Sequence, residues 1–396
     1  MNKLKKKNLY LEINNESFLV AIGEHDDELN FKIIDHETNS PSGFRNGKLI
    51  NLVNATESFK KAIKAVENKT NFVFSEVNII INQTNFDCIN VSGFKKLNGN
   101  QILSDDISYI LNDIKSKLLD SEKDKKIIHL FNTKYLLDNK QIKNLPIGLH
   151  GDFYSHQLTF FLIKNNELKD LKTLFNKCNL DINKIILKSF SDGIKIVNRY
   201  KNDTFIKIKL GRDESTLSFF SESAFCFSQK FNFGSDIILK DISKVCSLEI
   251  STIKKIITDT NFKVSDQNLY VDKKYFENNN FRKISLQHII EISSARIEEI
   301  SNIIFNKNKN LNELTDKEVF LYLDFEDENI LHKFQNIFEN NLKKCRLKFL
   351  TEKDKDPLES IKIFGQLLSK GWAREAIPVV NKKRSIISRI FSGFFD

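Results

Sequence analysis

One succession of elements occurs twice along this chain, and it limits the possible folds more than any single motif does. Apolar and polar residues alternate over 8–38, which predicts a strand meander, and helical spacing follows over 55–67. The same order of strands followed by helices begins again near residue 204 and continues to residue 260. The sequence therefore predicts an α/β protein built from two similar halves.

The length of 396 residues is too great for one hydrophobic core, which also favours two or more domains. Two α/β halves, each interrupted by an insertion, favour an actin-like (RNase H-like) fold with a nucleotide cleft between the halves. The predicted boundaries are 8–80, 163–200 and 357–376 for the first half, 81–162 for a segment inserted into it, 201–243 and 309–356 for the second half, 244–308 for a small subdomain, and 382–396 for a C-terminal helix.

The inserted segment has clear local patterns of its own. Its apolar spacing predicts a helix from Asp105 to Leu119, with Ser104 or Asp105 as the N-terminal cap. Two apolar runs that follow, at 127–131 and 134–137, predict two separate strands.

Glycine is scarce, with 13 residues in 396, about half of the usual ~7%. Loops that hold phosphate groups use glycine because it lets backbone N–H groups approach the ligand closely. The chain is therefore short of the residues that an ordinary nucleotide site needs.

The net charge of +9 arises from 61 basic and 52 acidic residues, which allows an anionic partner. No aromatic-and-basic recognition motif supports nucleic acid as that partner.

The cysteines and the hydropathy pattern point to the cytoplasm. The five cysteines stand far apart and form neither a metal-binding spacing nor a disulfide framework, so we expect reduced thiols. The basic start of the chain is not followed by the apolar core of a signal peptide. No apolar stretch is long enough to cross a bilayer.

The last residues, 382–396, combine positive charge with a bulky apolar stripe. At about 100° per residue, the apolar side chains fall on one half of a helix; they are Ile386, Ile387, Ile390, Phe391, Phe394 and Phe395. Lys383, Arg384 and Arg389 supply positive charge beside that stripe. This pattern is typical of a helix that lies in a membrane interface, and anionic lipid would add to its attraction. The alternatives are a helix docked on its own domain and a frayed end.

Several short motifs follow one another along the chain in a distinctive order. They are Glu12–Ser17 before a strand that ends in Gly-Glu, a Ser-x-Phe-x-x-Gly type turn within 42–47, the loop Ile142–Gly151, and a helix with Arg296 and Glu299. In this order they resemble the actin-like bacterial cell-division protein FtsA. The corresponding family motifs are D-I-G-[ST]-[ST]-K, S-x-G-I-x-x-G, I-x-N-P-x-G-M-x-G and I-I-x-x-R-x-x-E-I. The resemblance covers nearly the whole chain.

The resemblance implies a structural adaptor that is not an enzyme. Such an adaptor tethers filaments of the tubulin-like protein FtsZ to the inner face of the cytoplasmic membrane, with 382–396 as the membrane contact. It assembles with itself as actin does, and the segment 88–119 of the inserted subdomain, 81–162, is used for self-association and for later division proteins. The family's cofactor is ATP, and the positions that correspond to its binding residues are Asn14, Asn15, Ser17, Gly211, Gly234 and Asp241.

The resemblance also names a partner site. The family binds the C-terminal peptide of FtsZ, which is both apolar and acidic, on the small subdomain predicted at 244–308. A basic surface suits such a peptide. The residues expected there are Arg282, Lys283, Arg296 and Glu299.

The chain departs from the family at all three nucleotide loops. The second phosphate loop, D-I-G-G-G-T in the family, is Lys209–Glu214 here, so a lysine replaces the metal-side aspartate. The first loop has Asn14 in place of glycine, and the adenosine loop T-G-G-G is replaced by Leu323–Asp327. Extra carboxylates repel a phosphate, so weak or lost ATP binding and hydrolysis, and no metal site, are predicted.

Two other functions remain open at this point. One is an actin-like binding protein of pilus assembly, whose partner is the tail of a membrane protein. The other is an actin-fold enzyme that depends on ATP, against which the missing glycines and the missing catalytic aspartate argue.

Overall fold

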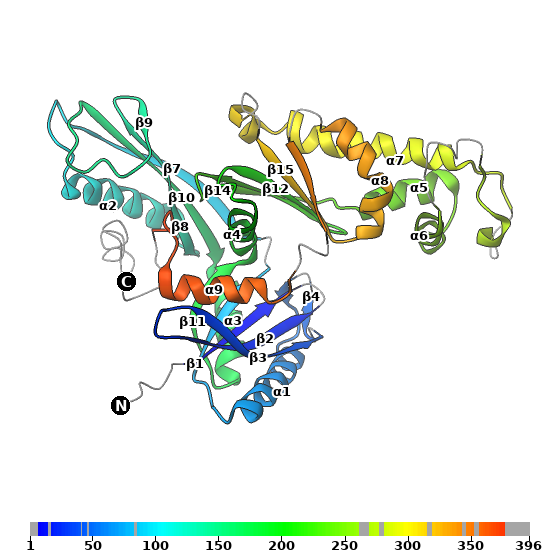
Figure 1. Ribbon diagram of the computed structural model, residues 1–396, viewed down its shortest axis with the longest axis horizontal. Helices are drawn as coiled ribbons and strands as arrows, with labels where there is room; N and C mark the ends of the chain where they lie inside the picture. The colour runs from blue at the N-terminus through cyan, green and yellow to red at the C-terminus, as the bar shows by residue number, and fades with distance from the viewer. Residues whose placement is uncertain are drawn as a thin grey trace. The chain divides into compact units, whose positions relative to one another are not determined.

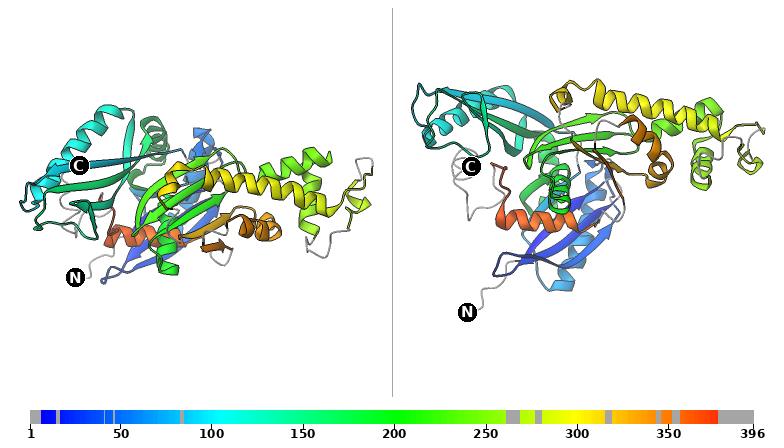
Figure 2. Two further views of the ribbon diagram at one scale, coloured as in Figure 1. Left: turned by 90° about the horizontal axis from the view of Figure 1, so that it is seen from above. Right: turned by 45° about the horizontal axis from the view of Figure 1, so that its top comes forward.

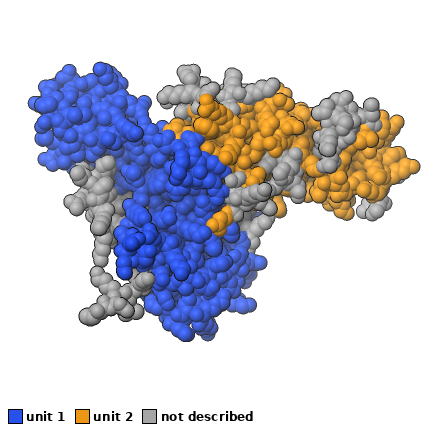
Figure 3. All heavy atoms as spheres, in the orientation of Figure 1, with its two compact units in different colours: residues 1–203, 220–227, 357–396 blue, residues 204–219, 228–356 orange. Residues whose placement is uncertain are grey.

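The computed structural model describes residues 7–14, 17–40, 42–45, 47–82, 85–260, 269–276, 281–314, 319–342, 346–351 and 356–376. The chain divides into two compact units (Figure 3). Unit 1 comprises 1–203, 220–227 and 357–396, and unit 2 comprises 204–219 and 228–356.

A five-stranded mixed sheet forms the centre of unit 1, in the order β11-β6-β1-β2-β3. β1 is antiparallel to β2, β2 is antiparallel to β3, and the pairs β1–β6 and β6–β11 are parallel. The strand bounds are β1 (Lys7–Ile13), β2 (Phe18–His25), β3 (Phe31–Asn39), β6 (Glu76–Ile81) and β11 (Asp181–Leu187). β1 and β6 are buried along most of their length because helices cover the sheet.

Four helices of unit 1 pack in two pairs against this sheet (Figure 1). Phe59 of α1 meets Phe18 of β2, and α1 also packs against α3. Phe364 of α9 meets Tyr10 of β1, and α9 packs against α4. The helices are α1 (Leu52–Thr70), α3 (Asn165–Lys177), α4 (Lys188–Tyr200) and α9 (Glu359–Lys370), and a short hairpin, β4 (Phe44–Arg45) and β5 (Lys48–Leu49), precedes α1.

Between β6 and α3 the chain forms a second sheet of unit 1, called here the inserted sheet. Its four strands lie in the order β7-β10-β8-β9 and are antiparallel. Helix α2 (Ser104–Ser121) covers one face, as Figures 1 and 2 show. Gly93 of β7 lets α2 approach, because a Cβ at this position would collide with Ile110. The strands are β7 (Asp87–Lys96), β8 (Lys125–Leu137), β9 (Lys140–Ile142) and β10 (Phe153–Lys164).

Unit 2 contains most of a third sheet, in the order β14-β13-β12-β15-β16. β12 is parallel to β15 and β15 is parallel to β16. The strands are β12 (Phe205–Leu210), β13 (Ser215–Ser221), β14 (Ala224–Phe231), β15 (Phe320–Phe325) and β16 (Arg346–Leu350). Helices α5 to α8 pack on one another; they are α5 (Asp236–Cys246), α6 (Ile250–Asp259), α7 (Leu286–Ser301) and α8 (Glu328–Asn341).

Three shorter helical segments complete unit 2: η2 (Lys273–Phe276), a π-helical turn η3 (Asn302–Asn306) that extends α7, and η4 (Lys309–Leu314).

The two five-stranded sheets repeat one topology. Read from the meander edge, β3-β2-β1-β6-β11 corresponds to β14-β13-β12-β15-β16, with the last two pairs parallel in both. The prediction of two similar α/β halves is therefore confirmed at the level of the sheets. β7, β11 and α4 were not expected from the sequence.

Two local predictions for the inserted segment are wrong. The runs at 127–131 and 134–137 belong to one strand, β8, because Thr133 is accommodated as an irregularity opposite Gln157 and Leu158. The N-terminus of α2 is not capped by Ser104 or Asp105. Instead the N-cap is Leu103, and its backbone N–H donates to the Asp106 carboxylate at 2.8 Å.

After α9, residues 372–376 form what we call the anchor segment, which adds to the free edge of β8. Ala376 N donates to Leu130 O at 2.7 Å, and Asn132 N donates to Arg374 O at 2.9 Å. Arg374 also forms an ion pair with Glu222. The anchor segment is therefore fixed to the inserted sheet through backbone and side-chain contacts.

Candidate functional site

Two hairpin turns occupy equivalent places in the two repeated sheets. The first turn, residues 14–17, joins β1 to β2, and the second turn, residues 211–214, joins β12 to β13. Each is closed in the same way: Asn14 N donates to Ser17 O at 2.9 Å, and Gly211 N donates to Glu214 O at 3.1 Å. These are the two stretches that the sequence predicts as phosphate loops. Asn15 lies outside the described residues.

Beside the first turn, the carboxylate of Glu12 is buried and already neutralised. Lys188, the first residue of α4, forms an ion pair with it and also donates to Ser360 Oγ at 2.7 Å. Asp192 Oδ1 lies 3.9 Å from the same ammonium group. A carboxylate held in this way is poorly placed to serve a metal or a phosphate. Sequence reasoning missed Lys188 because it did not detect α4.

The second turn packs closely on the N-terminus of α5. Ser235 N donates to Gly211 O at 2.8 Å, and Asp236 N donates to Arg212 O at 3.0 Å. Gly234 is required here, because a Cβ would collide with both carbonyl oxygens. Gly211 and Gly234, both predicted to bind a cofactor, are thus brought together by packing within unit 2.

Charges of both signs surround the second turn, and Lys240 Nζ lies 3.9 Å from Asp213 Oδ1. The backbone N–H of Arg212 donates to Glu326 Oε2 at 3.1 Å. Glu214 forms an ion pair with Lys230, at 2.5 Å, and Asp324 Oδ2 lies 3.3 Å from Lys207 Nζ. A nucleotide needs backbone N–H groups and positive charge at this position. Because the N–H groups of Gly211 and Arg212 are already bonded within unit 2, this turn does not fit the phosphates of ATP. Among the described residues, no group of three or more His, Cys, Asp or Glu side chains is arranged to hold a metal ion.

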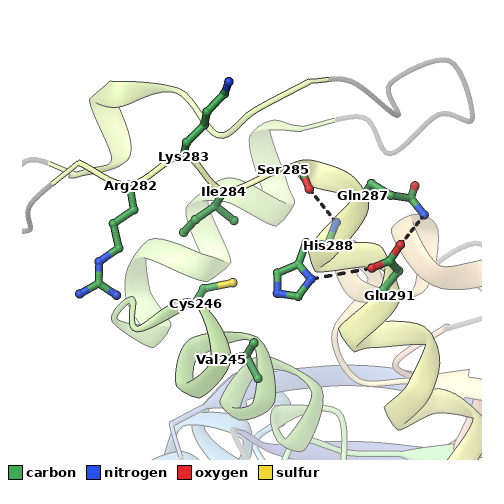
Figure 4. A pocket seen from close by; sticks show the side chains of 9 residues that line it. All are labelled: Val245, Cys246, Arg282, Lys283, Ile284, Ser285, Gln287, His288 and Glu291. Atoms are coloured by element: carbon green, nitrogen blue, oxygen red, sulfur yellow. Dashed lines mark hydrogen bonds and ion pairs between the residues drawn. The ribbon is translucent and has the colours of Figure 1, made fainter.

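A basic hollow lies on the small helical part of unit 2, with a volume of about 470 Å³ (Figure 4). Arg282 and Lys283, both predicted partner residues, are exposed at its edge. Figure 4 shows their side chains pointing in different directions, and Lys283 Nζ lies 4.4 Å from the ring centroid of Tyr270. The hollow is lined by Val245, Cys246, Arg282, Lys283, Ile284, Ser285, Gln287, His288 and Glu291.

The backbone that forms the hollow is well fixed. Val271 N donates to Ile284 O and Leu286 N donates to Leu269 O, each at 2.9 Å, so the segment before α7 is paired with residues 269–271. Ser285 caps α7 by accepting a hydrogen bond from His288 N at 3.1 Å. The sequence had no local signal for the contribution of α5 to the hollow, because that contribution depends on how α5 packs against α7.

The other two predicted partner residues, Arg296 and Glu299, lie together on α7. Arg296 forms ion pairs with both Glu299 and Asp241 of α5. The hydrogen bond with Asp241 is the main cause that raises the pKa of Arg296. Asp241, predicted to bind a cofactor, is thus placed beside Arg296. The cofactor role of Asp241 and the partner role of Arg296 stay predictions.

The predicted membrane residues, 383–395, lie outside the described residues. Within the described ranges, no helix is long and apolar enough to cross a bilayer.

The chain matches no known protein-family model. It is 21% identical over 245 residues to the cell division protein FtsA of Buchnera aphidicola, covering 61% of this chain and 58% of the relative. It is 16% identical over 234 residues to FtsA of Pseudomonas aeruginosa, covering 59% of this chain and 56% of the relative. These matches span little more than half the length of the curated relatives.

One solved structure is similar over almost the whole chain. It is a chain of the PilM–PilN type IV pilus biogenesis complex, with a TM-score of 0.53, 7% identity, and coverage of 98% of this chain and 94% of that one. The fold is actin-like. The similarity to FtsA in sequence is distant, and the similarity to the pilus complex shows the fold alone.

Proposed function

We propose that this actin-like protein is a cell-division adaptor that links FtsZ filaments to the inner face of the cytoplasmic membrane and is not an enzyme. The sequence similarity to FtsA, over 61% of the chain, carries this proposal. The second turn supports it, because its Gly211 and Arg212 N–H groups are already bonded within unit 2 and are not offered to the phosphates of ATP.

The basic hollow is the proposed site for the FtsZ peptide. Val245 and Ile284 offer apolar contact area, while Arg282 and Lys283 offer positive charge to the acidic residues of the peptide. Arg296 contributes less to the attraction of an acidic partner, because Asp241 and Glu299 already balance its charge. The peptide is therefore expected to depend mainly on Arg282 and Lys283.

Membrane contact is assigned to 382–396, whose basic and apolar residues suit an anionic bilayer surface. Self-assembly into filaments and contact with later division proteins, both through the segment 88–119, belong to the same proposal, by analogy with FtsA. The anchor segment is relevant to the membrane contact, because it fixes the chain to unit 1 up to residue 376, shortly before the proposed membrane segment at 382–396.

The test of the partner site is a titration of the full chain with a fluorescent FtsZ C-terminal peptide. The double variant Arg282→Glu and Lys283→Glu should weaken binding at least tenfold, because two attractions of about 0.5–1 kcal/mol each are replaced by repulsions. The double variant Lys254→Glu and Lys255→Glu, at two exposed positions of α6, is the matched control and should bind as the parent does. Equal affinity of the double variant and the control would remove the hollow from the proposal.

The test of the membrane contact is co-sedimentation with anionic liposomes. The parent chain should sediment with the liposomes, and a chain that ends at residue 381 should stay in the supernatant. Sedimentation of both would show that another surface binds lipid.

A second candidate is an adaptor of pilus assembly, which the similarity to the PilM–PilN complex over 98% of the chain favours. The same titration separates the two functions. Binding of the FtsZ peptide supports the first, whereas binding of only a peptide from a PilN-type membrane protein supports the second.

A further inference from the structure

In the second turn, the backbone groups of Gly211 and Arg212 are bonded within unit 2. The N–H of Gly211 is bonded to Glu214 O, and the N–H of Arg212 is bonded to Glu326 Oε2. The carbonyl groups of Gly211 and Arg212 accept from the first residues of α5. A phosphate that entered this turn would therefore have to displace existing partners.

The position of Glu326 is fixed by the sheet. Glu326 directly follows β15, and its backbone N–H donates to Leu210 O at 3.0 Å, at the end of β12. In unit 1 the equivalent residue is Asn82, which directly follows β6 and donates to Ile13 O at 3.2 Å. The two halves thus place a neutral amide beside the first turn and a carboxylate beside the second.

The carboxylate of Glu326 has the properties that a turn of this kind selects in a ligand. It is an anion, and its oxygen accepts a hydrogen bond from a backbone N–H, as a phosphate oxygen does. It also lies close to Gly211, where a Cβ would stand 3.0 Å from Oε2. Because Glu326 belongs to the same chain, it is present at the turn at every concentration of free nucleotide.

We propose that Glu326 is a built-in substitute for phosphate at the second turn, so that the protein takes no nucleotide there and binds its partners without one. This inference rests on contacts within unit 2 and does not require the FtsZ partner. It predicts that Mg²⁺ and ATP leave the behaviour of the parent chain unchanged.

The experiment is calorimetric titration of the full chain with MgATP and, separately, with inorganic triphosphate. The parent should show no saturable binding up to about 1 mM ligand. Glu326→Ala removes the acceptor of the Arg212 N–H and one negative charge, so it should bind triphosphate with a Kd of about 0.1 mM or lower, at least tenfold below the ~1 mM limit of the parent. Glu298→Gln, an exposed position on α7, removes the same charge elsewhere in unit 2 and should behave as the parent does.

Two results would overturn the proposal. One is micromolar binding of MgATP by the parent chain. The other is a Glu326→Ala variant that is folded by circular dichroism and gains no affinity for triphosphate. If that variant does not fold, Glu326→Gln replaces it, because the amide keeps the oxygen acceptor and loses the charge; it should then gain at least threefold, and no gain refutes the proposal. A peptide titration of the parent with and without MgATP should agree within twofold.

Discussion

Besides its backbone bonds to β8 and the Arg374–Glu222 ion pair, the anchor segment is held by one buried side-chain hydrogen bond, which we expect Glu375→Ala to break. Glu375 Oε1 accepts from His129 Nδ1 at 2.5 Å, and both side chains are about 1% exposed. Nε2 of the same imidazole accepts a hydrogen bond from Leu187 N at 3.0 Å, so the proton of the ring is on Nδ1. The contact is therefore a neutral imidazole donating to a buried carboxylate, and alanine removes the acceptor.

The expected loss of unfolding free energy follows from three contributions. A hydrogen bond to a charged group contributes about 1.5–3 kcal/mol. Alanine keeps Cβ, so one buried methylene group of Glu375, Cγ, is lost, at about 0.8 kcal/mol. Glu375 Oε2 is buried without a hydrogen-bond partner, and relief of that cost returns about 1–2 kcal/mol. The net loss is about 0.3–2.8 kcal/mol, which lowers the melting temperature by roughly 1–11 °C for a unit of this size.

Trp372 makes this loss measurable at the anchor segment itself. It is the only tryptophan of the chain, and its Nε1 donates to Ser223 O at 2.7 Å. Thermal unfolding should be followed by tryptophan fluorescence and by far-ultraviolet circular dichroism. In Glu375→Ala the emission should shift to longer wavelength at a lower temperature than in the parent. Glu57→Ala, on the exposed face of α1, is the control and should change stability by less than about 0.5 kcal/mol.

A conservative variant separates charge from geometry. Glu375→Gln keeps an oxygen that can accept from His129 and loses the negative charge, so its loss should lie between those of the control and Glu375→Ala. If Glu375→Ala melts within 1 °C of the control with the same emission maximum, the anchor segment does not depend on this contact and the reasoning fails.

Two further predictions concern the core of unit 1. Burial lowers the pKa of His156 to about 3. As the pH decreases below about 6.5, the unfolded chain takes up a proton at this histidine and the folded chain does not, so the free energy of unfolding decreases as the pH decreases. Between pH 6.5 and 5 the parent should lose about 2 kcal/mol more than His156→Gln in denaturant unfolding, and equal losses would contradict this. Gly193→Ala should destabilise by about 1–3 kcal/mol, because the new methyl group collides with the ring of Phe220, which is stacked on Phe225. Adding Phe220→Leu should recover part of that loss in the same measurement; a variant as stable as the parent would refute the collision.

The sequence predicts the elements of this fold well wherever the pattern is local. Alternation over 8–38 and helical spacing over 55–67 depend on neighbouring residues, and they correspond to β1–β3 and α1. The prediction failed where a tertiary contact overrides the local pattern. β8 continues as one strand through the polar residues at its centre. Asn132 is buried there, and its backbone N–H donates to the carbonyl oxygen of Arg374, a residue far away in the sequence.

The candidate sites divide in the same way. Scarce glycine and the altered loops argue from the sequence against ordinary phosphate binding. They do not show which groups satisfy the second turn. That answer needs the register between β12 and β15, which brings Glu326 to a turn 114 residues earlier. The positive edge of the hollow was predictable, but its apolar side comes from α5 and needs the packing of α5 on α7.

The sequence by itself determines that this is a two-part α/β chain with few glycines and a basic amphipathic end, because these properties are carried by neighbouring residues. Only the tertiary structure decides that Glu12 is neutralised by Lys188, that Glu375 holds His129, and that Glu326 occupies the second turn. Each of these contacts joins residues more than 100 positions apart. Their meeting depends on strand register and helix packing, which no local pattern specifies.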